Sequence, residues 1–313
     1  NKLGIKGSPT AELVFNNAPA QLVGDRKLGL IKYVMSLMNG ARLGVGAQSV
    51  GLAEAAYREA VKYANEREQF GKAIINFPQV YEMLANMRAK TDAIRTLLYE
   101  TARSVDMYKS LEAISRERKL ENDERATLKT YSRLADALTP MLKLFSSEYA
   151  NQITYDCIQV HGGSGFMKDY ACERFYRDAR ILTIYEGTSQ LQVVAAIRGV
   201  VSGAYVARIK EYEAIEVRDE LKPLRQTLIS LREEFEKVYE IAKEWGSSSE
   251  AFDFNSRRLV EIAGYLVMCN LLVNDANKDA MFTKSAKIMT KLFFTIMIGL
   301  SFRLFGNTLC KFF

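Results

Sequence analysis

Apolar residues recur at helical spacing along most of this chain, most clearly between Pro78 and Lys109. In that stretch the core positions lie three and four residues apart, which places them on one face of a helix. Pro78 suits the first turn, where its missing N–H is not needed. We therefore predict an amphipathic helix over residues 78–109, whose core stripe is Val80, Leu84, Met87, Thr91, Ile94, Leu98, Thr101 and Val105.

Three further helical stretches, residues 30–66, 126–160 and 188–206, complete a predicted four-helix up-down bundle. Pro140 predicts a kink in the second of them. The mixed-charge segment 115–125 indicates a solvated connector or a helix end. Residues 30–66 contain glycines that lower helix propensity. These glycines indicate either the close approach of a backbone or ligand, or close helix packing alone. They are Gly40, Gly44, Gly46 and Gly51.

Residues 1–26 differ from the bundle. Their opening stretch, residues 2–15, ends in a short strand pattern at Leu13 to Phe15. A single strand cannot satisfy its own ladder hydrogen bonds. We expect this β remnant to pair with another chain, or to belong to a sheet that has been cut away.

Residues 207–313 are predicted to form an additional helical region beside the bundle, which occupies residues 27–206. A helix over 208–245, a turn over 246–249 and a helix over 251–275 make a hairpin. The apolar run 292–302 has about half of the roughly 20 residues that a membrane span needs. It predicts a buried terminal helix or a partner contact, and no membrane span. The fold class expected for the whole chain is mainly α.

Charge and composition narrow the range of functions. The net charge is +6, with 43 Lys and Arg against 37 Asp and Glu in mixed runs. Such a balance suits anionic small ligands such as CoA or FAD, and it does not indicate nucleic acid binding.

The four cysteines are scattered without metal-like spacing, which predicts reduced thiols in a cytoplasmic protein. The single histidine, His161, excludes a multi-histidine metal site, and a Ser-His-Asp triad would have to use it. Its place in a glycine-rich loop favours packing over catalysis. We therefore predict no metal site. The four cysteines are Cys157, Cys172, Cys269 and Cys310.

Glu186 is the strongest candidate for chemistry. It is the lone carboxylate of the run IYEGTSQ (residues 184–190), and a glycine and two hydroxyl residues follow it. Partly desolvated surroundings of this kind suit a general base. The alternative is a carboxylate that only stabilises a helix N-terminus through the helix dipole.

Residues 159–190, from the glycine-rich loop QVHGGSGF to this run, resemble the C-terminal signature of the flavin-dependent acyl-CoA dehydrogenases. The opening strand and the segments 41–44 and 65–72 match the same family, so the resemblance spans residues 2 to about 200. The region after residue 208 resembles a longer bacterial branch that includes methylthiopropionyl-CoA and long-chain acyl-CoA dehydrogenases. The final 20-odd residues do not resemble that branch.

The resemblance assigns roles to individual residues. Arg67, Gln69 and Phe70 fall where the family holds the pyrophosphate and adenine end of FAD, although Arg67 also suits an ordinary helix C-terminus. Positions that contact FAD bound mainly by a neighbouring subunit are Gln159 and Gly163. Those that bond the chain's own FAD are Thr188 and Gln190, and those expected near the substrate are Arg42, Tyr185 and Gly187.

The reaction implied by the resemblance is α,β-dehydrogenation of an acyl-CoA thioester. Glu186 takes the α-proton, and the β-hydrogen leaves as hydride to N5 of the flavin. Some relatives carry the base beside the position of Arg42, where this chain has Ala41. The family also implies electron-transfer flavoprotein as electron acceptor and a homodimer or homotetramer. We expect this chain alone to be inactive.

Three alternatives remain open at this point: a flavoprotein of the same superfamily that binds nucleic acid, a helical interaction module without chemistry, and an acyl-CoA oxidase.

Overall fold

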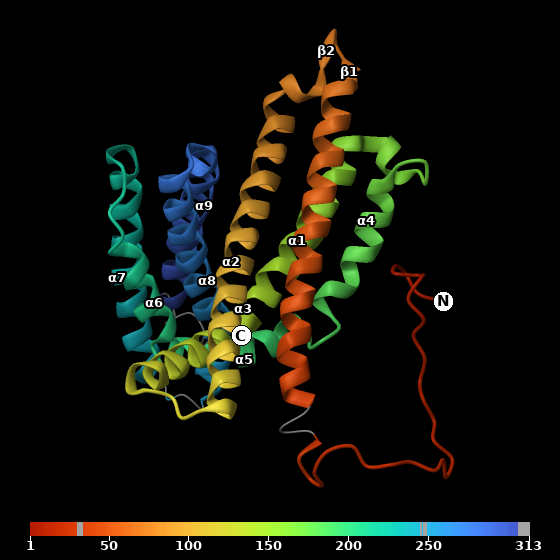
Figure 1. Ribbon diagram of the computed structural model, residues 1–313. Helices are drawn as coiled ribbons and strands as arrows, with labels where there is room; N and C mark the ends of the chain where they lie inside the picture. The colour runs from red at the N-terminus through yellow and green to blue at the C-terminus, as the bar shows by residue number, and fades with distance from the viewer. Residues whose placement is uncertain (30–33, 245, 247–248, 306–313) are drawn as a thin grey trace.

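The computed structural model describes residues 1–29, 34–244, 246 and 249–305, and its regular structure is mainly helical (Figure 1), which confirms the predicted fold class. Three long helices form the centre: α1 (Met35–Glu66), α2 (Pro78–Glu117) and α3 (Asn122–His161). Each packs against the other two, and α5 (Ser189–Val201) packs against α3 as the fourth helix of the bundle.

The glycines of α1 have different surroundings. A Cβ on Gly46 would lie 2.7 Å from Leu142 of α3, so close helix packing explains this glycine. A Cβ on Gly40, Gly44 or Gly51 would meet nothing within 4 Å. Close packing therefore accounts for Gly46 and not for the other three.

Two predicted helices are broken where the backbone turns. The helix expected over 188–206 ends at Val201, because Gly203 is left-handed (φ 71°) and α6 (Ala204–Glu213) starts after a bend of 67°. The helix expected over 208–245 is also interrupted, by residues 214–218 and η5 (Asp219–Leu221). It resumes as α7 (Lys222–Glu244), with Pro223 in the first turn, where proline is tolerated.

The connections carry short elements that we did not predict. A two-stranded antiparallel hairpin, β1 (Glu68–Gln69) and β2 (Lys72–Ala73), joins α1 to α2 through η2 (Ile74–Asn76). Between α3 and α5 lie η3 (Gly162–Phe166), α4 (Ala171–Ala179) and η4 (Arg180–Thr183). The long α3 continues through Pro140 as one helix.

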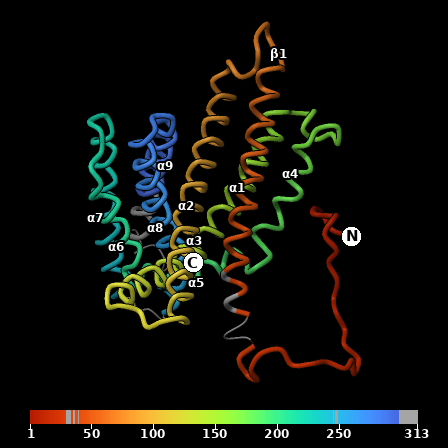
Figure 2. Tube along the Cα trace, viewed as in Figure 1, coloured from red at the N-terminus to blue at the C-terminus, as the bar shows by residue number. Residues whose placement is uncertain are grey.

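Residues 1–29 form an extended arm that leaves the bundle (Figure 2) and contains no strand. The arm touches α4 near its start, where the Ile5 N–H donates to Asp178 Oδ1 at 2.6 Å. Its apolar residues Leu13 to Phe15 are more than 70% exposed. The predicted strand thus has no pairing partner among the described residues.

The C-terminal region forms the predicted hairpin of α7 and α8 (Glu250–Lys278), followed by η6 (Ala280–Phe282) and α9 (Thr283–Phe305). Among the described helices, α8 is long and apolar enough to cross a membrane, and the bent pair α5 and α6 passes the same test when counted as one span. However, 89% of the most apolar window of α8 is buried in the protein. In the predicted apolar tail, Phe293 and Met297 are buried. Leu292 and Ile296 are half-buried and Phe294 is 49% exposed, whereas the side chains after Met297, and Cys310, lie outside the described residues.

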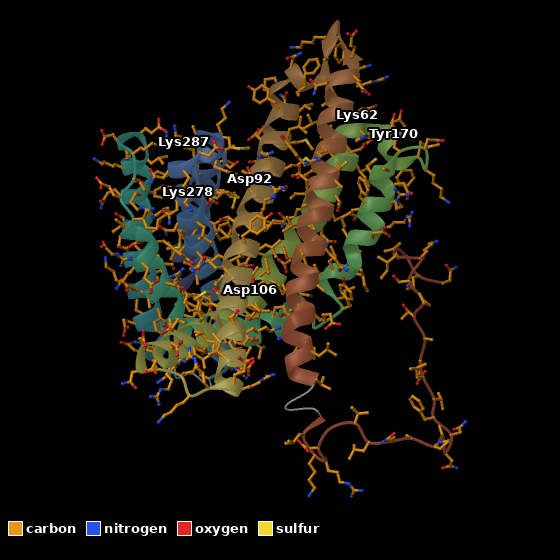
Figure 3. All side chains as sticks on the ribbon, in the orientation of Figure 1. Lys62, Asp92, Asp106, Tyr170, Lys278 and Lys287 are labelled. Carbon is orange, nitrogen blue, oxygen red and sulfur yellow. The ribbon has the colours of Figure 1, made fainter. Side chains whose placement is uncertain are left out.

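Buried polar contacts join this region to the bundle. Asp92 of α2 (Figure 3) accepts hydrogen bonds from Arg88, Arg95 and Ser285 at 2.7–2.9 Å, and Ser285 belongs to α9. Glu100 of α2 accepts from Arg208 and Tyr212 of α6 at 2.7–3.0 Å. The fold therefore places α6 to α9 firmly against one side of the bundle.

Candidate active site

Glu186 lies in the short loop between η4 and α5, and it adopts an uncommon backbone conformation. Its φ is 53° and that of Gly187 is 89°, so two successive residues are left-handed. Glycine tolerates this region, whereas a glutamate there must be held by its surroundings. Thr188 then caps α5 by accepting a hydrogen bond from the Leu191 N–H at 3.5 Å.

Side chains from three helices hold the loop. Gln192 Nε2, on α5, donates to the carbonyl oxygens of Glu186 (3.1 Å) and Gly187 (3.0 Å). Lys143 Nζ, on α3, donates to the Gly187 oxygen at 2.6 Å. The Tyr185 hydroxyl donates to Gln48 Oε1 of α1 at 2.5 Å. The loop conformation is thus fixed by the bundle itself.

Two cations surround the half-buried Glu186. Burial lowers the pKa of Arg42, and the charge of Glu186 partly offsets this effect. Burial and the neighbouring Arg42 lower the pKa of Lys143 to about 8, against the opposing effect of Glu186 and Glu148. Burial, and then the Glu186 charge, raise the pKa of Tyr185. The structure therefore brings the predicted Arg42, Tyr185 and Gly187 together with Glu186.

Five of the predicted cofactor residues gather at the hairpin end of the bundle. Arg67, Gln69 and Phe70 lie in or beside the hairpin, and the Phe70 ring is 92% exposed. Gln159 and Gly163 are exposed where α3 passes into η3.

Tyr63 of α1 joins the hairpin end to η3. Its ring stacks on His161 with the centroids 4.2 Å apart, and its hydroxyl donates to Ser164 Oγ at 3.2 Å. Figure 3 shows the neighbouring Lys62 and Tyr170 at this end. His161 has the packing role expected from its place in the glycine-rich loop.

The two groups of predicted residues lie at opposite ends of the bundle. Arg42 and Arg67 are separated by 25 positions along α1, which at 1.5 Å per residue corresponds to about 37 Å. The predicted residues therefore form two separate groups within one chain.

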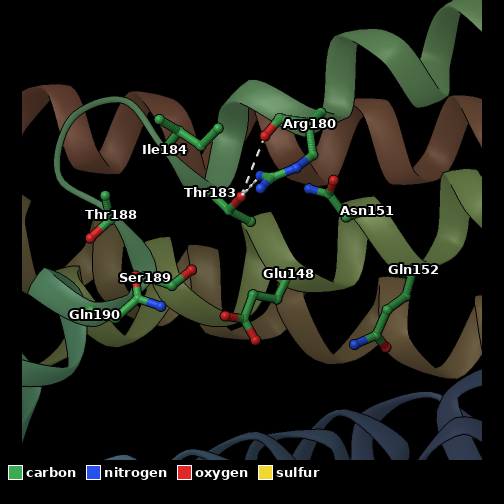
Figure 4. Close-up of a pocket in the computed structure, with 9 residues that line it drawn as sticks. All are labelled: Glu148, Asn151, Gln152, Arg180, Thr183, Ile184, Thr188, Ser189 and Gln190. Atoms are coloured by element: carbon green, nitrogen blue, oxygen red, sulfur yellow. Dashed lines mark hydrogen bonds between the residues drawn. The ribbon is translucent and has the colours of Figure 1, made fainter.

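A surface pocket of about 520 Å³ lies beside the Glu186 loop (Figure 4) and includes the predicted Thr188 and Gln190. Ser189 Oγ is buried without a protein partner, and Arg180 contributes a cation. The N-terminus of α5 also opens here, and such a terminus favours anionic groups. These features fit a phosphate-bearing part of a cofactor such as FAD.

The fold also brings together a buried trio that the sequence spacing did not indicate. One ligand atom from each of Cys157, His161 and Cys172 lies within 4.8 Å of the others. Burial, above all, raises the pKa of both thiols, whereas a metal binds the thiolate. Nδ1 of His161 is also engaged with the Cys157 carbonyl at 2.7 Å. We therefore assign no metal centre to this trio.

Sequence reasoning missed three residues at the Glu186 loop and its pocket: Lys143, Gln192 and Arg180. One signal was available for Lys143, because it interrupts the apolar run of residues 140–145 in the middle of a predicted core helix. Gln192 has no such signal, since its role arises only from the loop that folds back against α5.

Two family models cover most of the chain. Residues 31–200 match the acyl-CoA dehydrogenase C-terminal domain, and residues 201–293 match a second model described as acyl-CoA dehydrogenase C terminal. The boundary between the two lies near the bend between α5 and α6.

Several curated relatives are similar over the bundle. Acryloyl-CoA reductase (NADH) of Anaerotignum propionicum is 40% identical over 203 residues, which are 64% of this chain and 45% of that protein. The 3-methylmercaptopropionyl-CoA dehydrogenase of Ruegeria pomeroyi is 38% identical over 61% of this chain and 32% of its own. The caffeyl-CoA reductase-Etf complex subunit CarC of Acetobacterium woodii is 35% identical, over 61% of this chain and 45% of its own. The chain thus spans less than half the length of these relatives.

Solved structures extend the similarity into the C-terminal helices. ACDH-11 of Caenorhabditis elegans in complex with C11-CoA has a TM-score of 0.78 at 25% identity, over 93% of this chain and 48% of that one. An acyl-CoA dehydrogenase of Bacillus anthracis complexed with FAD has a TM-score of 0.67 at 25% identity, over 87% and 48%. With a family model matching more than half of its residues, the chain belongs to the acyl-CoA dehydrogenase family.

Proposed function

We propose that this chain forms the helical part of a flavin-dependent active site in which Glu186 removes the α-proton of an acyl-CoA thioester. The observation that carries the proposal is the left-handed Glu186, half-buried beside Arg42 and Lys143 and fixed by contacts from α1, α3 and α5. The names of the relatives, which act on acryloyl-CoA, caffeyl-CoA and 3-methylmercaptopropionyl-CoA, support the class of substrate.

The residues divide the work as follows. The Glu186 carboxylate accepts the proton from the α-carbon. Arg42, Tyr185 and Gly187 border the place where the thioester would lie. The flavin, when bound, supplies the acceptor for the β-hydrogen.

The cofactor would be FAD, held from two directions. Thr188 and Gln190 line the pocket beside the loop and would bind the chain's own FAD. At the hairpin end, Arg67, Gln69 and Phe70 would hold the pyrophosphate and adenine end of FAD. Gln159 and Gly163 would contact FAD bound mainly by a neighbouring subunit, in a homodimer or homotetramer. The CarC name, which places that relative in a complex with Etf, supports electron-transfer flavoprotein as electron acceptor. A cytoplasmic location stays a prediction.

The test uses the natural protein that carries this sequence, loaded with FAD and kept free of oxygen. Saturated acyl-CoAs of graded chain length are added, and loss of the visible absorbance of the oxidised flavin is followed. We expect one chain-length class to reduce the flavin. Glu186→Gln should slow this step by about 100- to 10,000-fold, the usual contribution of a general base, and should leave FAD bound.

Glu173→Gln is the matched control, because Glu173 is also half-buried but pairs with Arg177 on α4, away from the loop. It should keep the normal rate. A second arm adds 2-enoyl-CoA to the reduced protein and measures the reverse direction, since some relatives are reductases. Retained turnover in Glu186→Gln contradicts the role of Glu186. Bound flavin that no acyl-CoA or enoyl-CoA changes contradicts the proposed reaction, and a protein that binds no flavin does so as well.

A further inference from the structure

Lys143 is a charged residue in a place where a core helix normally carries an apolar one. Its side chain is fully buried, between Leu142 and Leu144 on α3. Buried lysines require a partner that offsets their desolvation. The partner here is the backbone carbonyl of Gly187, 2.6 Å from Nζ.

That carbonyl belongs to the left-handed pair that carries Glu186. Gln192 donates to the same oxygen at 3.0 Å and to the Glu186 oxygen at 3.1 Å, so two side chains hold two successive peptide groups. Peptide groups are planar, and the two that are held, 186–187 and 187–188, flank Gly187 and so fix the turn directly after Glu186. On the other side of Glu186, the Tyr185 hydroxyl is tied to Gln48 of α1. The position of its carboxylate then depends on Lys143 and Gln192.

Lys143 also acts through its charge. The charged groups that affect it are Arg42 on α1, Glu148 on its own helix and Glu186 in the loop. With a pKa of about 8, Lys143 is a cation at neutral pH. As a cation it makes a charge-assisted, and therefore stronger, hydrogen bond to the Gly187 carbonyl.

We propose that Lys143 is a positioning residue for Glu186, which holds the left-handed loop together with Gln192. This inference rests on the proposed function for its catalytic consequence. Its structural part, the control of the loop by Lys143, stands independently of any activity.

The catalytic test compares flavin reduction in three variants of the natural, FAD-loaded protein. Lys143→Met keeps the length and removes both donor and charge; we expect the rate at saturating acyl-CoA to fall by about 100-fold, the size of effect that a small misplacement of a catalytic group produces. KM and bound FAD should change little. Gln192→Leu should also slow the reaction, and it provides the test if Lys143→Met does not fold.

The matched control is Thr139→Val, one helical turn before Lys143 on α3. Thr139 is equally buried, but its hydroxyl donates to Ala135 O at 2.7 Å within the helix. We expect a normal rate.

Amide hydrogen exchange in the chain without flavin tests the loop directly. Exchange at residues 186–191 should speed up at least 10-fold in Lys143→Met and stay unchanged in Thr139→Val. Normal exchange and a normal rate in Lys143→Met would overturn the inference while Glu186→Gln still tests the reaction. Faster exchange in a protein that shows no reaction would uphold the control of the loop and refute the proposed function.

Discussion

The contact between α2 and α6 offers a sharp test of how the C-terminal helices are held. Glu100 of α2 is 9% exposed and accepts hydrogen bonds from Arg103 on its own helix and from Arg208 and Tyr212 on α6. The change Glu100→Gln keeps the shape and removes the charge. It leaves Arg208, whose side chain is 17% exposed, with the largely exposed Glu211 as its remaining carboxylate.

Breaking a buried ion pair by removing one partner costs about 3–5 kcal/mol, because the other charge is left buried. Gln retains an acceptor oxygen and Arg103 is 44% exposed, so we expect the lower end, a loss of about 3 kcal/mol in the free energy of unfolding. With a denaturant slope of about 3 kcal/mol per molar urea, the unfolding midpoint falls by about 1 M.

The control on the same helix is Glu112→Gln. Glu112 is 53% exposed and lies 3.7 Å from Arg116, and such a surface pair contributes about 0.3–0.5 kcal/mol. Its midpoint should hardly move. Equal shifts for the two variants would refute the reasoning that burial makes Glu100 important.

The pH dependence gives an independent check. Burial raises the pKa of Glu100, but the hydrogen bonds and charges of Arg103 and Arg208 outweigh it, so the folded-state pKa lies below the usual 4.5. A depressed carboxylate pKa contributes stability above 4.5, and this contribution is lost as the pH falls through the folded-state value. The difference between the native protein and Glu100→Gln should therefore be full at pH 7 and shrink in acid. A difference that stays constant into acid would contradict this account.

Two further predictions concern packing and the buried lysine. Gly264→Ala on α8 places a Cβ 2.1 Å from the Phe145 ring and should lower the free energy of unfolding by about 1–3 kcal/mol. Gly44→Ala on α1 places a Cβ where it meets nothing within 4 Å and should raise the free energy of unfolding by up to about 1 kcal/mol. Thermal melting of both variants measures the contrast, and equal melting temperatures would contradict it. Because burial and Arg42 lower the pKa of Lys143 from 10.5 to about 8, the unfolded chain binds more protons between those values, and the free energy of unfolding should rise with pH across that range. Urea midpoints at several pH values should show a smaller rise in Lys143→Met, and an identical rise would rule out this origin.

Hydrophobic periodicity was sufficient to predict the long helices. The helix expected over 78–109 is α2, and the one expected over 126–160 is α3, because a stripe of core residues repeated over many turns leaves no other way to bury it. Their ends shift by several residues, where capping decides. At α3, for example, the Glu121 side chain and Glu124 form a capping box that starts the helix at Asn122.

The breaks and short elements needed tertiary information. The highly charged α4 was missed because nine residues give too little periodicity and the helix is supported by contacts with α3 and α1. The bend at Gly203 carried a local signal, a glycine in a helical pattern, but the same pattern in α1 runs unbroken through Gly44 and Gly51. Local sequence does not decide between these outcomes, since the packing partner determines which glycine becomes left-handed.

Two departures from a stability-optimal sequence coincide at one place. A lysine is buried in the apolar centre of α3, although a methionine of similar length would avoid the desolvation. Three positions before α5 begins, a glutamate adopts a left-handed conformation that glycine would adopt without cost. The two residues are connected through one carbonyl, since Lys143 donates to the carbonyl oxygen of Gly187, the residue that follows Glu186. Local rules fail together in this way where a site, and not the fold, selects the residues. The coincidence therefore supports the Glu186 loop as the functional centre on grounds independent of the family resemblance.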